Sequence, residues 1–338
     1  MLLGHATWEF SNQPVIISTG VVGGPYEAKG KMADDFDILH EDQWLNEESF
    51  EKAQQKLLEE ACEIAIKKAN IQKEQVQYFI SGDLINQMTP STFAAKTVGV
   101  PYLGVFSACA TSAESLALSA LIVNSGGANY VLSGTASHNS ATERQYRYPT
   151  EYGGQKPPTA QWTVTGAGCA LVSQQGEGPV ITSATIGKIV DMGLTDPFNM
   201  GGAMAPAAVD TIIRHLQDRN IDYSYYDLII TGDLGKIGRE ASFDLLKEKG
   251  INLNEKQYVD CGLTIYRDDQ QVQSGASGTA SSAVATYGHF IKKMNEGKLN
   301  RILFVATGSL HSPLSIQQKD SIPCIAHAVS IEMRSELL

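Results

Sequence analysis

The order of apolar and polar positions divides the chain into short apolar runs and longer helix-like segments. Residues 15–19 and 76–81 form apolar runs of the length typical of buried strands. Residues 47–69 carry apolar side chains at helical spacing, with glutamates in the first turn, lysines in the last turn and Asn46 in position to cap the segment. Strands that alternate with helices in this way predict an α/β sheet protein.

Four short motifs occur twice along the chain and in the same order. The sequence FISGDL at 79–84 returns as IITGDL at 229–234. The other pairs are VIIST at 15–19 with VITSA at 180–184, CATSA at 109–113 with TASSA at 279–283, and NYVLSGTASH at 129–138 with NRILFVATGSLH at 300–311. Chance does not easily place four matches in one order. We therefore predict two homologous α/β halves, residues 1–176 and 177–338, packed as a pseudo-twofold pair.

The amino-acid composition excludes several classes of protein. Hydrophobic residues make up 43% and charged residues 19% of the 338 residues, a balance typical of a folded chain with a large core. No run of about 18 apolar residues is present, so no transmembrane helix is expected. The net charge of -11 argues against a nucleic-acid partner and means that an anionic ligand must be met by a local cluster of donors.

The cysteines and the N-terminus point to an intracellular protein. The five cysteines include no CxxC pair, so we expect reduced thiols rather than a disulfide framework or a structural zinc site. The N-terminal sequence MLLGHATWEF lacks the pattern of a signal peptide. The usual phosphate, zinc-protease and serine-hydrolase motifs are also missing, so no cofactor is expected and no metal ligands can be named.

Cys109 is the first candidate for chemistry. It stands in the sequence ACATS, after a predicted strand at 102–106 and at the start of a predicted helix. Helix N-terminal amides favour an anion, which would bias this thiol towards the thiolate and make it a candidate nucleophile. The alternative is that a small residue is required where helix and sheet pack closely, which is the commoner role of a buried cysteine.

Polar side chains that follow two predicted strands are the next candidates. Asp83 and Asn86 follow one strand and His138 follows another. Ligands of α/β sheets gather outside the carboxyl ends of the strands, so these side chains are expected to converge near Cys109. The alternative is ordinary capping of loops by short polar side chains.

A basic and aromatic segment at 139–156 is the third candidate. It contains Arg144, Arg147, Tyr148 and Lys156 in an otherwise acidic protein. Guanidinium groups bind carboxylates in a bidentate manner and tyrosines stack on planar rings, so the segment suits a small aromatic or acidic ligand. The same residue types are enriched at subunit interfaces, and an interface loop is the equal alternative.

The doubled halves and the ACATS turn resemble the thiolase and ketoacyl synthase superfamily, whose five-layered α-β-α-β-α fold carries its nucleophilic cysteine at such a helix start. Longer segments are similar to the stage V sporulation protein AD family (SpoVAD) over nearly the whole chain. They include SGTASHNSATERQYRYPTEYGGQKP, ITSATIGKIVDMGLTDPF, LIITGDLG and KLNRILFVATGSLHSP.

This resemblance implies a function in the bacterial spore. It implies a soluble, homodimeric subunit that binds dipicolinate (pyridine-2,6-dicarboxylate), with calcium as the counter-ion of the ligand. The subunit would act beside the membrane-embedded SpoVA proteins, peripherally on the spore inner membrane, in uptake of dipicolinate during sporulation and its release at germination. The residues expected to bind the ligand are Cys109, Asp83, Asn86, His138, Arg144, Arg147 and Tyr148.

Three departures from the condensing enzymes argue against catalysis. The chain reads TGD at 231–233 where those enzymes place a histidine, SGT at 277–279 where many carry histidine or asparagine, and IPCI at 322–325 in place of a glycine-rich loop. A thiolate without proton donors or an oxyanion hole loses most of its rate advantage. We therefore favour a non-catalytic binding subunit. The alternatives are an acyltransferase that uses Cys109, with His138 as base, and a purely structural adaptor.

Overall fold

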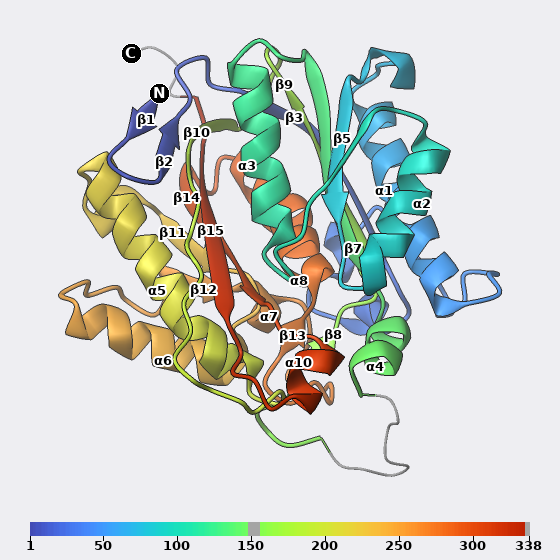
Figure 1. Cartoon of the computed structure of the whole chain (residues 1–338). Coiled ribbons are helices and arrows are strands. Elements are labelled where there is room, and N and C mark those ends of the chain that lie inside the picture. The colour runs from blue at the N-terminus through green and yellow to red at the C-terminus, as the bar shows by residue number, and fades with distance from the viewer. Residues whose placement is uncertain (148–155, 335–338) are drawn as a thin grey trace.

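A large β-sheet runs through the computed structural model, which describes residues 1–147 and 156–334 (Figure 1). The sheet has 13 strands. Its first-half strands are β1 (Leu2–Leu3), β2 (Thr7–Glu9), β3 (Val15–Gly23), β4 (Ile38–Leu39), β5 (Tyr78–Gly82), β6 (Tyr102–Gly104), β7 (Tyr130–Ser137) and β9 (Gly166–Ser173). Its second-half strands are β10 (Val180–Thr185), β11 (Leu228–Thr231), β12 (Tyr258–Asp260), β14 (Arg301–Ser309) and β15 (Cys324–Glu332). A separate pair is formed by β8 (Trp162–Thr163) and β13 (Ala276–Ser277).

The strand order is the same in the two parts of the sheet. From the outer edge inwards it is β6-β5-β7-β9-β3 in one part and β12-β11-β14-β15-β10 in the other, and the parts join where Val15 pairs with Val180. The first three strands of each part run parallel, and β9 and β15 run antiparallel to their neighbours. The repeated FISGDL and IITGDL motifs lie on the matching strands β5 and β11. The exact boundary at residue 176 stays a prediction.

Helices cover the sheet on both sides and also separate its two parts. They are α1 (Phe50–Lys68), α2 (Thr89–Val98), α3 (Thr111–Asn124), α4 (Asn139–Arg147), α5 (Met200–Arg219), α6 (Gly235–Glu248), α7 (Cys261–Thr264), α8 (Thr279–Val284), α9 (Ile291–Asn295) and α10 (Pro313–Gln317). In Figure 1, helices α1 and α2 cover one outer face of the sheet, and α5 and α6 cover the opposite outer face. Helices α3 and α8 lie between the two parts of the sheet. This arrangement confirms the predicted five-layered α/β fold.

The local sequence explains why the helices begin and pack as they do. Ser49 caps α1 by accepting a hydrogen bond from the Lys52 amide, so the helix begins three residues later than the pattern indicated and Asn46 is not its cap. The central helix α3 buries small and apolar side chains such as Ala117 and Ala120, which lets both parts of the sheet approach it closely. None of the helices in the described ranges is long and apolar enough to cross a bilayer.

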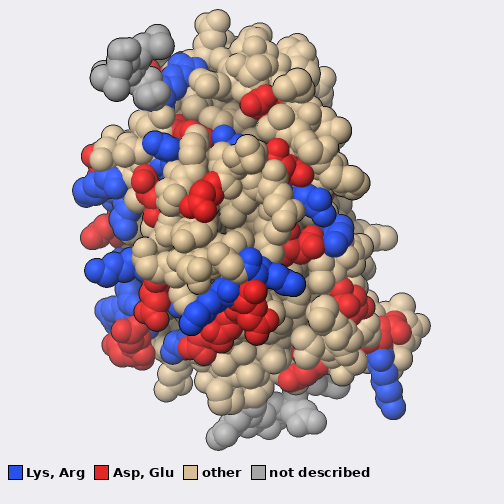
Figure 2. All heavy atoms as spheres, turned by 90° about the vertical axis from the view of Figure 1, so that its left-hand side faces the viewer, with Lys and Arg blue, Asp and Glu red and all other residues tan. Residues whose placement is uncertain are grey.

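Charges of both signs are interspersed on the face that carries α5 and α6 (Figure 2). One example is the contact between Lys188 and Asp210, at 3.0 Å from Nζ to Oδ1. A mixed surface of this kind exerts little long-range attraction on an anion. This face therefore does not attract an anionic ligand from a distance.

Candidate functional site

The turn before α3 holds Cys109 in a strained position. Ala108 has a φ of 48°, a left-handed conformation that non-glycine residues rarely adopt. The Ala108 carbonyl accepts a hydrogen bond from the Thr111 hydroxyl at 2.7 Å, and that hydroxyl oxygen accepts one from the Ser107 amide at 3.2 Å. A side chain at Gly308 on β14 would collide with the Ser107 carbonyl, at 2.2 Å from a Cβ atom. The turn is thus clamped between its own hydrogen bonds and the second half of the protein.

Asp233 contacts the Cys109 thiol from the end of β11. The Asp233 carboxylate accepts hydrogen bonds from the Thr307 hydroxyl at 2.9 Å and from the Gly278 amide at 3.1 Å. Burial raises the pKa of Asp233 to about 7, although the hydrogen bond with Cys109 opposes the shift. Burial and the charge of Asp233 hold the pKa of Cys109 well above its usual value. The expectation of a thiolate at this helix start is therefore wrong, because desolvation and a neighbouring carboxylate outweigh the helix amides.

Gly278 brings backbone rather than a side chain to the same place. Its φ is 96°, and a Cβ atom here would lie 2.8 Å from the Ser137 hydroxyl oxygen. A larger residue is therefore excluded unless Ser137 moves. The position where many condensing enzymes carry histidine or asparagine thus offers an N–H group, which Asp233 engages.

Apolar and aromatic side chains surround Cys109. Leu84 after β5, Leu310 after β14 and Tyr146 on α4 pack against it. The Tyr146 hydroxyl donates a hydrogen bond to the Leu84 carbonyl at 2.8 Å, and its ring lies 5.6 Å from the imidazole of His311. Burial raises the pKa of Tyr146 and lowers the pKa of His311, so both rings are neutral at neutral pH. The site is a mostly apolar cluster of side chains, with two rings beside a buried thiol and a buried carboxyl group.

Asp83 lies at the matching position of the first half but faces a different way. Its carboxylate accepts hydrogen bonds from the amide and hydroxyl of Ser91, at 2.8 and 2.5 Å, and from the Ile85 amide at 2.7 Å. Ser91 lies in the first turn of α2, so Asp83 caps this helix. Burial raises the pKa of Asp83 to about 6. The local donors occupy both oxygens, which agrees with the capping alternative.

His138 is buried among partners of its own. Its Nδ1 accepts a hydrogen bond from the Ser140 amide at 3.2 Å, so its Nε2 carries the proton and donates to the Gln43 carbonyl at 2.8 Å. Its ring stacks on Phe50 with 5.1 Å between centroids. Burial lowers the pKa of His138. These contacts hold the ring between α1 and the loop that contains Gln43, and none of them joins the ring to Cys109.

The remaining candidates are Asn86, Arg144, Arg147 and Tyr148. Asn86 is exposed, and its backbone N–H donates a hydrogen bond to the side-chain oxygen of Gln145 at 2.7 Å. Arg144 is exposed and forms an ion pair with Glu51. Arg147 ends α4, and Tyr148 lies outside the described residues. Their roles as ligand contacts stay predictions.

Lys156 is the other described cation of the basic and aromatic segment. It pairs with Glu143 at 2.9 Å and lies over the ring of Trp162.

The sequence predicted which loops meet at Cys109, but not all of the side chains that contact it. The loop after β5 and helix α4 do meet at Cys109, through Leu84 and Tyr146. Asp233 and Gly278 had been noted as departures from the condensing enzymes but not as members of the site. The repeat was the signal for Asp233, because it is the counterpart of Asp83.

No group of three or more histidine, cysteine, aspartate or glutamate side chains in the described ranges is arranged to hold a metal ion. Asp233 is the carboxyl group nearest to the thiol, and its oxygens already have protein partners. A cation would thus have to arrive with a ligand that supplies further oxygen atoms.

Comparisons with known proteins agree with this geometry. The family model described as stage V sporulation protein AD matches residues 4–332. The chain is 47% identical over 331 residues to the stage V sporulation protein AD of Bacillus subtilis (strain 168), and the match covers 98% of each protein.

Solved structures of condensing enzymes share the fold. The 3-oxoacyl-(acyl-carrier-protein) synthase III of Aquifex aeolicus VF5 aligns with a TM-score of 0.56 at 15% identity, covering 94% of this chain and 99% of that one. Human mitochondrial 3-ketoacyl-CoA thiolase aligns with a TM-score of 0.60 at 12% identity, covering 96% and 100%. The fold is therefore thiolase-like, and the match along almost its whole length shows that the chain belongs to the stage V sporulation protein AD family.

Proposed function

We propose that the protein is a non-catalytic subunit that binds dipicolinate beside Cys109, between Tyr146 and His311. The resemblance to the family implies the identity of the ligand, and it also implies a location in the forespore or spore, on the inner membrane beside the SpoVA proteins. The side chains around Cys109 support the proposal. Tyr146 and His311 offer aromatic rings, and Leu84 and Leu310 offer apolar walls, which together suit a planar pyridine.

The contact between Cys109 and Asp233 is the observation that carries the non-catalytic role. A condensing enzyme needs a thiolate and a proton donor beside it. Here a carboxyl group stands where the condensing enzymes place a histidine, and burial together with the charge of this group raises the pKa of the thiol. The pair therefore keeps the sulfur protonated and weakly nucleophilic.

The ionisation state of Asp233 determines the conditions under which the site can bind a dianion. Ionised Asp233 repels a ligand carboxylate, whereas protonated Asp233 can donate a hydrogen bond to it. Because the pKa of Asp233 is about 7, binding near neutral pH should be accompanied by proton uptake. Calcium carried by the ligand would provide the other means of neutralising this charge.

Calorimetric titration with dipicolinate at pH 6 and pH 8, with and without calcium, tests the proposal. Without calcium we expect the affinity to fall by up to about tenfold per pH unit above pH 7, the limit for uptake of one proton. Asp233→Asn should bind more tightly than wild type at pH 8 and should lose this pH dependence. Glu177→Gln, an exposed change elsewhere, is the matched control. Absence of binding under all four conditions would refute the proposal.

Two substitutions separate the pocket from its rim. Tyr146→Ala removes a ring from the pocket and should weaken dipicolinate binding by about tenfold or more. If Arg144 leaves Glu51 to bind a carboxylate, Arg144→Ala should weaken binding by roughly ten- to a hundredfold. An effect of Arg144→Ala without any effect of Tyr146→Ala would place the ligand on the rim instead.

An acyltransferase that uses Cys109 is the second candidate. The strained Ala108 turn, which presents the cysteine at the start of α3, favours it. Intact-mass measurement after incubation with acyl-CoA distinguishes the two. A stoichiometric acyl adduct on Cys109 within minutes would support the enzyme, whereas the binding subunit should remain unmodified.

We also propose a homodimer formed through the outer edge of β6. This strand lies at one edge of the large sheet, and within the described chain it pairs with β5 alone. Leu103 on the strand, Phe106 after it and Phe93 on the adjoining helix α2 are each more than 40% exposed. An open edge flanked by apolar side chains suits pairing with a second copy of the chain.

A further inference from the structure

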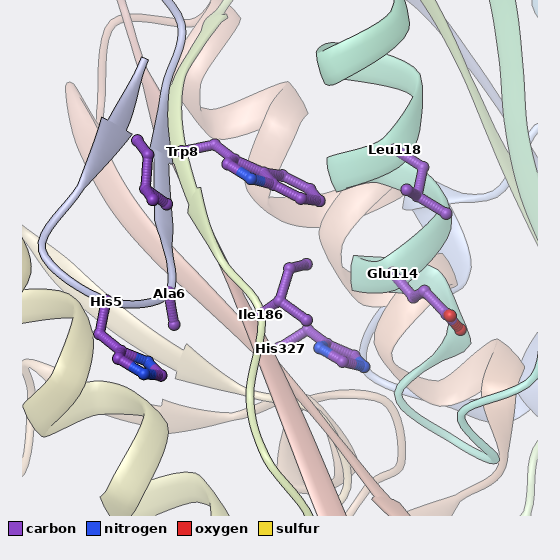
Figure 3. A pocket seen from close by; sticks show the side chains of 8 residues that line it. His5, Ala6, Trp8, Glu114, Leu118, Ile186 and His327 are labelled. Carbon is purple, nitrogen blue, oxygen red and sulfur yellow. The ribbon is translucent and has the colours of Figure 1, made fainter.

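A hollow lies between α3, β15 and the hairpin of β1 and β2 (Figure 3). Its volume is about 300 Å³. The walls are mainly apolar, and three polar side chains interrupt them. The lining residues are Leu2, His5, Ala6, Trp8, Glu114, Leu118, Ile186 and His327.

A chain of hydrogen bonds fixes the polar side of this hollow. The Gly187 amide donates to Nδ1 of His327 at 3.2 Å, so the other ring nitrogen, Nε2, carries the proton. Nε2 lies 3.0 Å from the Ser107 hydroxyl oxygen and donates to it. The Ser107 hydroxyl is then free to donate to the carboxylate of Glu114, with which it is hydrogen-bonded. Every donor in this series of hydrogen bonds has one acceptor, and the series ends on the Glu114 carboxyl group. Burial raises the pKa of Glu114, although the hydrogen bond with Ser107 opposes the shift.

Glu114 has acceptor capacity that the protein does not use. Its Oε2 atom is buried and has no hydrogen-bond partner among the described residues. An unpaired buried carboxylate oxygen is costly, and native structures usually provide such an atom with a donor. His327 cannot be that donor, because burial lowers its pKa to about 4 and its one proton is directed at Ser107.

The other side of the hollow suits an apolar body. Trp8 on β2 and Ile186 after β10 face Leu118, which lies one helical turn beyond Glu114 on α3 (Figure 3). The indole ring can contact hydrocarbon with its face and also attract a cation. Dipicolinate suits this place poorly, because its carboxylates would meet Glu114 without a positive side chain among the lining residues.

We propose that this hollow is a binding site for a small organic amine, whose ammonium group donates to Glu114 and whose apolar part lies against Trp8 and Leu118. Ser107 is hydrogen-bonded to His327 and Glu114, which line the hollow, and it stands two residues before Cys109, so the two sites share one turn. The proposal does not depend on dipicolinate binding, because it uses a different set of side chains.

Benzylamine is the probe that tests the proposal, with benzyl alcohol as its uncharged counterpart. Calorimetry should show one benzylamine bound per chain, and the indole N–H resonance of Trp8 should shift along the titration. Benzyl alcohol should bind at least about tenfold more weakly, because it lacks the charge that Glu114 recognises.

Two variants decide whether the site is the one described. Glu114→Gln keeps the shape but removes the charge and should weaken benzylamine binding by about ten- to a hundredfold. Ala6→Phe fills the hollow from the opposite wall and should abolish binding in a protein that melts cooperatively. Glu177→Gln, an exposed glutamate far along the chain, should leave the affinity unchanged. Absence of saturable binding to wild type, or unchanged affinity in Glu114→Gln or in a folded Ala6→Phe, would overturn the proposal.

Discussion

Asp83 and Asp233 show how one repeated residue serves two purposes. Both follow the single glycine of the repeated motif directly, after β5 and β11 respectively. Asp83 accepts bonds from Ser91, only eight residues away, and caps a helix. Asp233 accepts bonds from Gly278 and Thr307, which are 45 and 74 residues away, and contacts Cys109. The repeat therefore predicted where the second carboxyl group lies, but its partners depend on long-range packing that the local sequence does not reveal.

The first prediction concerns the reactivity of Cys109. In wild type, alkylation of Cys109 by iodoacetamide at pH 8 should be slow, because burial and Asp233 raise the pKa of the thiol. Asp233→Asn removes the negative charge and should speed alkylation by several-fold, up to about tenfold for each pKa unit recovered. Peptide-level mass spectrometry reports the rate at each cysteine.

Asp244→Asn is the matched control, since Asp244 is exposed on α6. Its alkylation rate should equal that of wild type. Equal rates in wild type and Asp233→Asn would show that the carboxyl group does not restrain the thiol.

At the scale of secondary-structure elements, the periodic spacing of apolar residues identified the elements whose packing is local. Helix α1 follows from its apolar spacing and terminal charges, although its cap proved to be Ser49. Helix α3 is buried on almost every side, so an amphipathic pattern could not describe it. The segment at 139–156 was predicted to offer Arg144 to a ligand, and part of it forms helix α4, which packs Tyr146 near Cys109 and leaves Arg144 beside Glu51. Orientation of this kind depends on contacts between distant elements.

The second prediction separates a cap from an exposed loop residue. Asp83→Ala should lower the free energy of unfolding by about 1–3 kcal/mol, because it leaves the amides of Ser91 and Ile85 without their acceptor. Asn86→Ala, three residues later and exposed, should change it by no more than about 0.5 kcal/mol. Denaturation by urea measures both.

If both variants unfold at the same urea concentration as wild type, Asp83 does not stabilise the fold. This result would then return Asp83 to the set of ligand contacts that the sequence suggested.

At the scale of the whole molecule, the internal repeat was the most informative property of the sequence. Matching motifs fall on matching strands, and the two parts of the sheet have the same order. The join between β3 and β10 could not be predicted, because only Val15 and Val180 pair across it. Recognition of the family supplied the five layers, and packing between the halves supplied the site, since Cys109 comes from one half and Asp233 from the other.

The third prediction concerns assembly. Light scattering at micromolar concentration should give the mass of a dimer for wild type. The double variant Leu103→Lys, Phe106→Lys places two charges at the open edge of β6 and should give a monomer. Leu314→Lys on α10, which changes a leucine that is 62% exposed elsewhere, should leave the dimer intact.

A monomeric wild-type protein would contradict the proposed homodimer. A double variant that remains dimeric would instead move the interface away from β6.

A crystal structure determined with saturating dipicolinate tests the central claim most directly. Our account predicts the pyridine ring in the pocket beside Cys109, in contact with Tyr146 and with one carboxylate directed towards Asp233 or towards a calcium ion between them. Density for dipicolinate against Trp8 and Glu114, or on the outer surface of α4 with the Cys109 pocket empty, would contradict it.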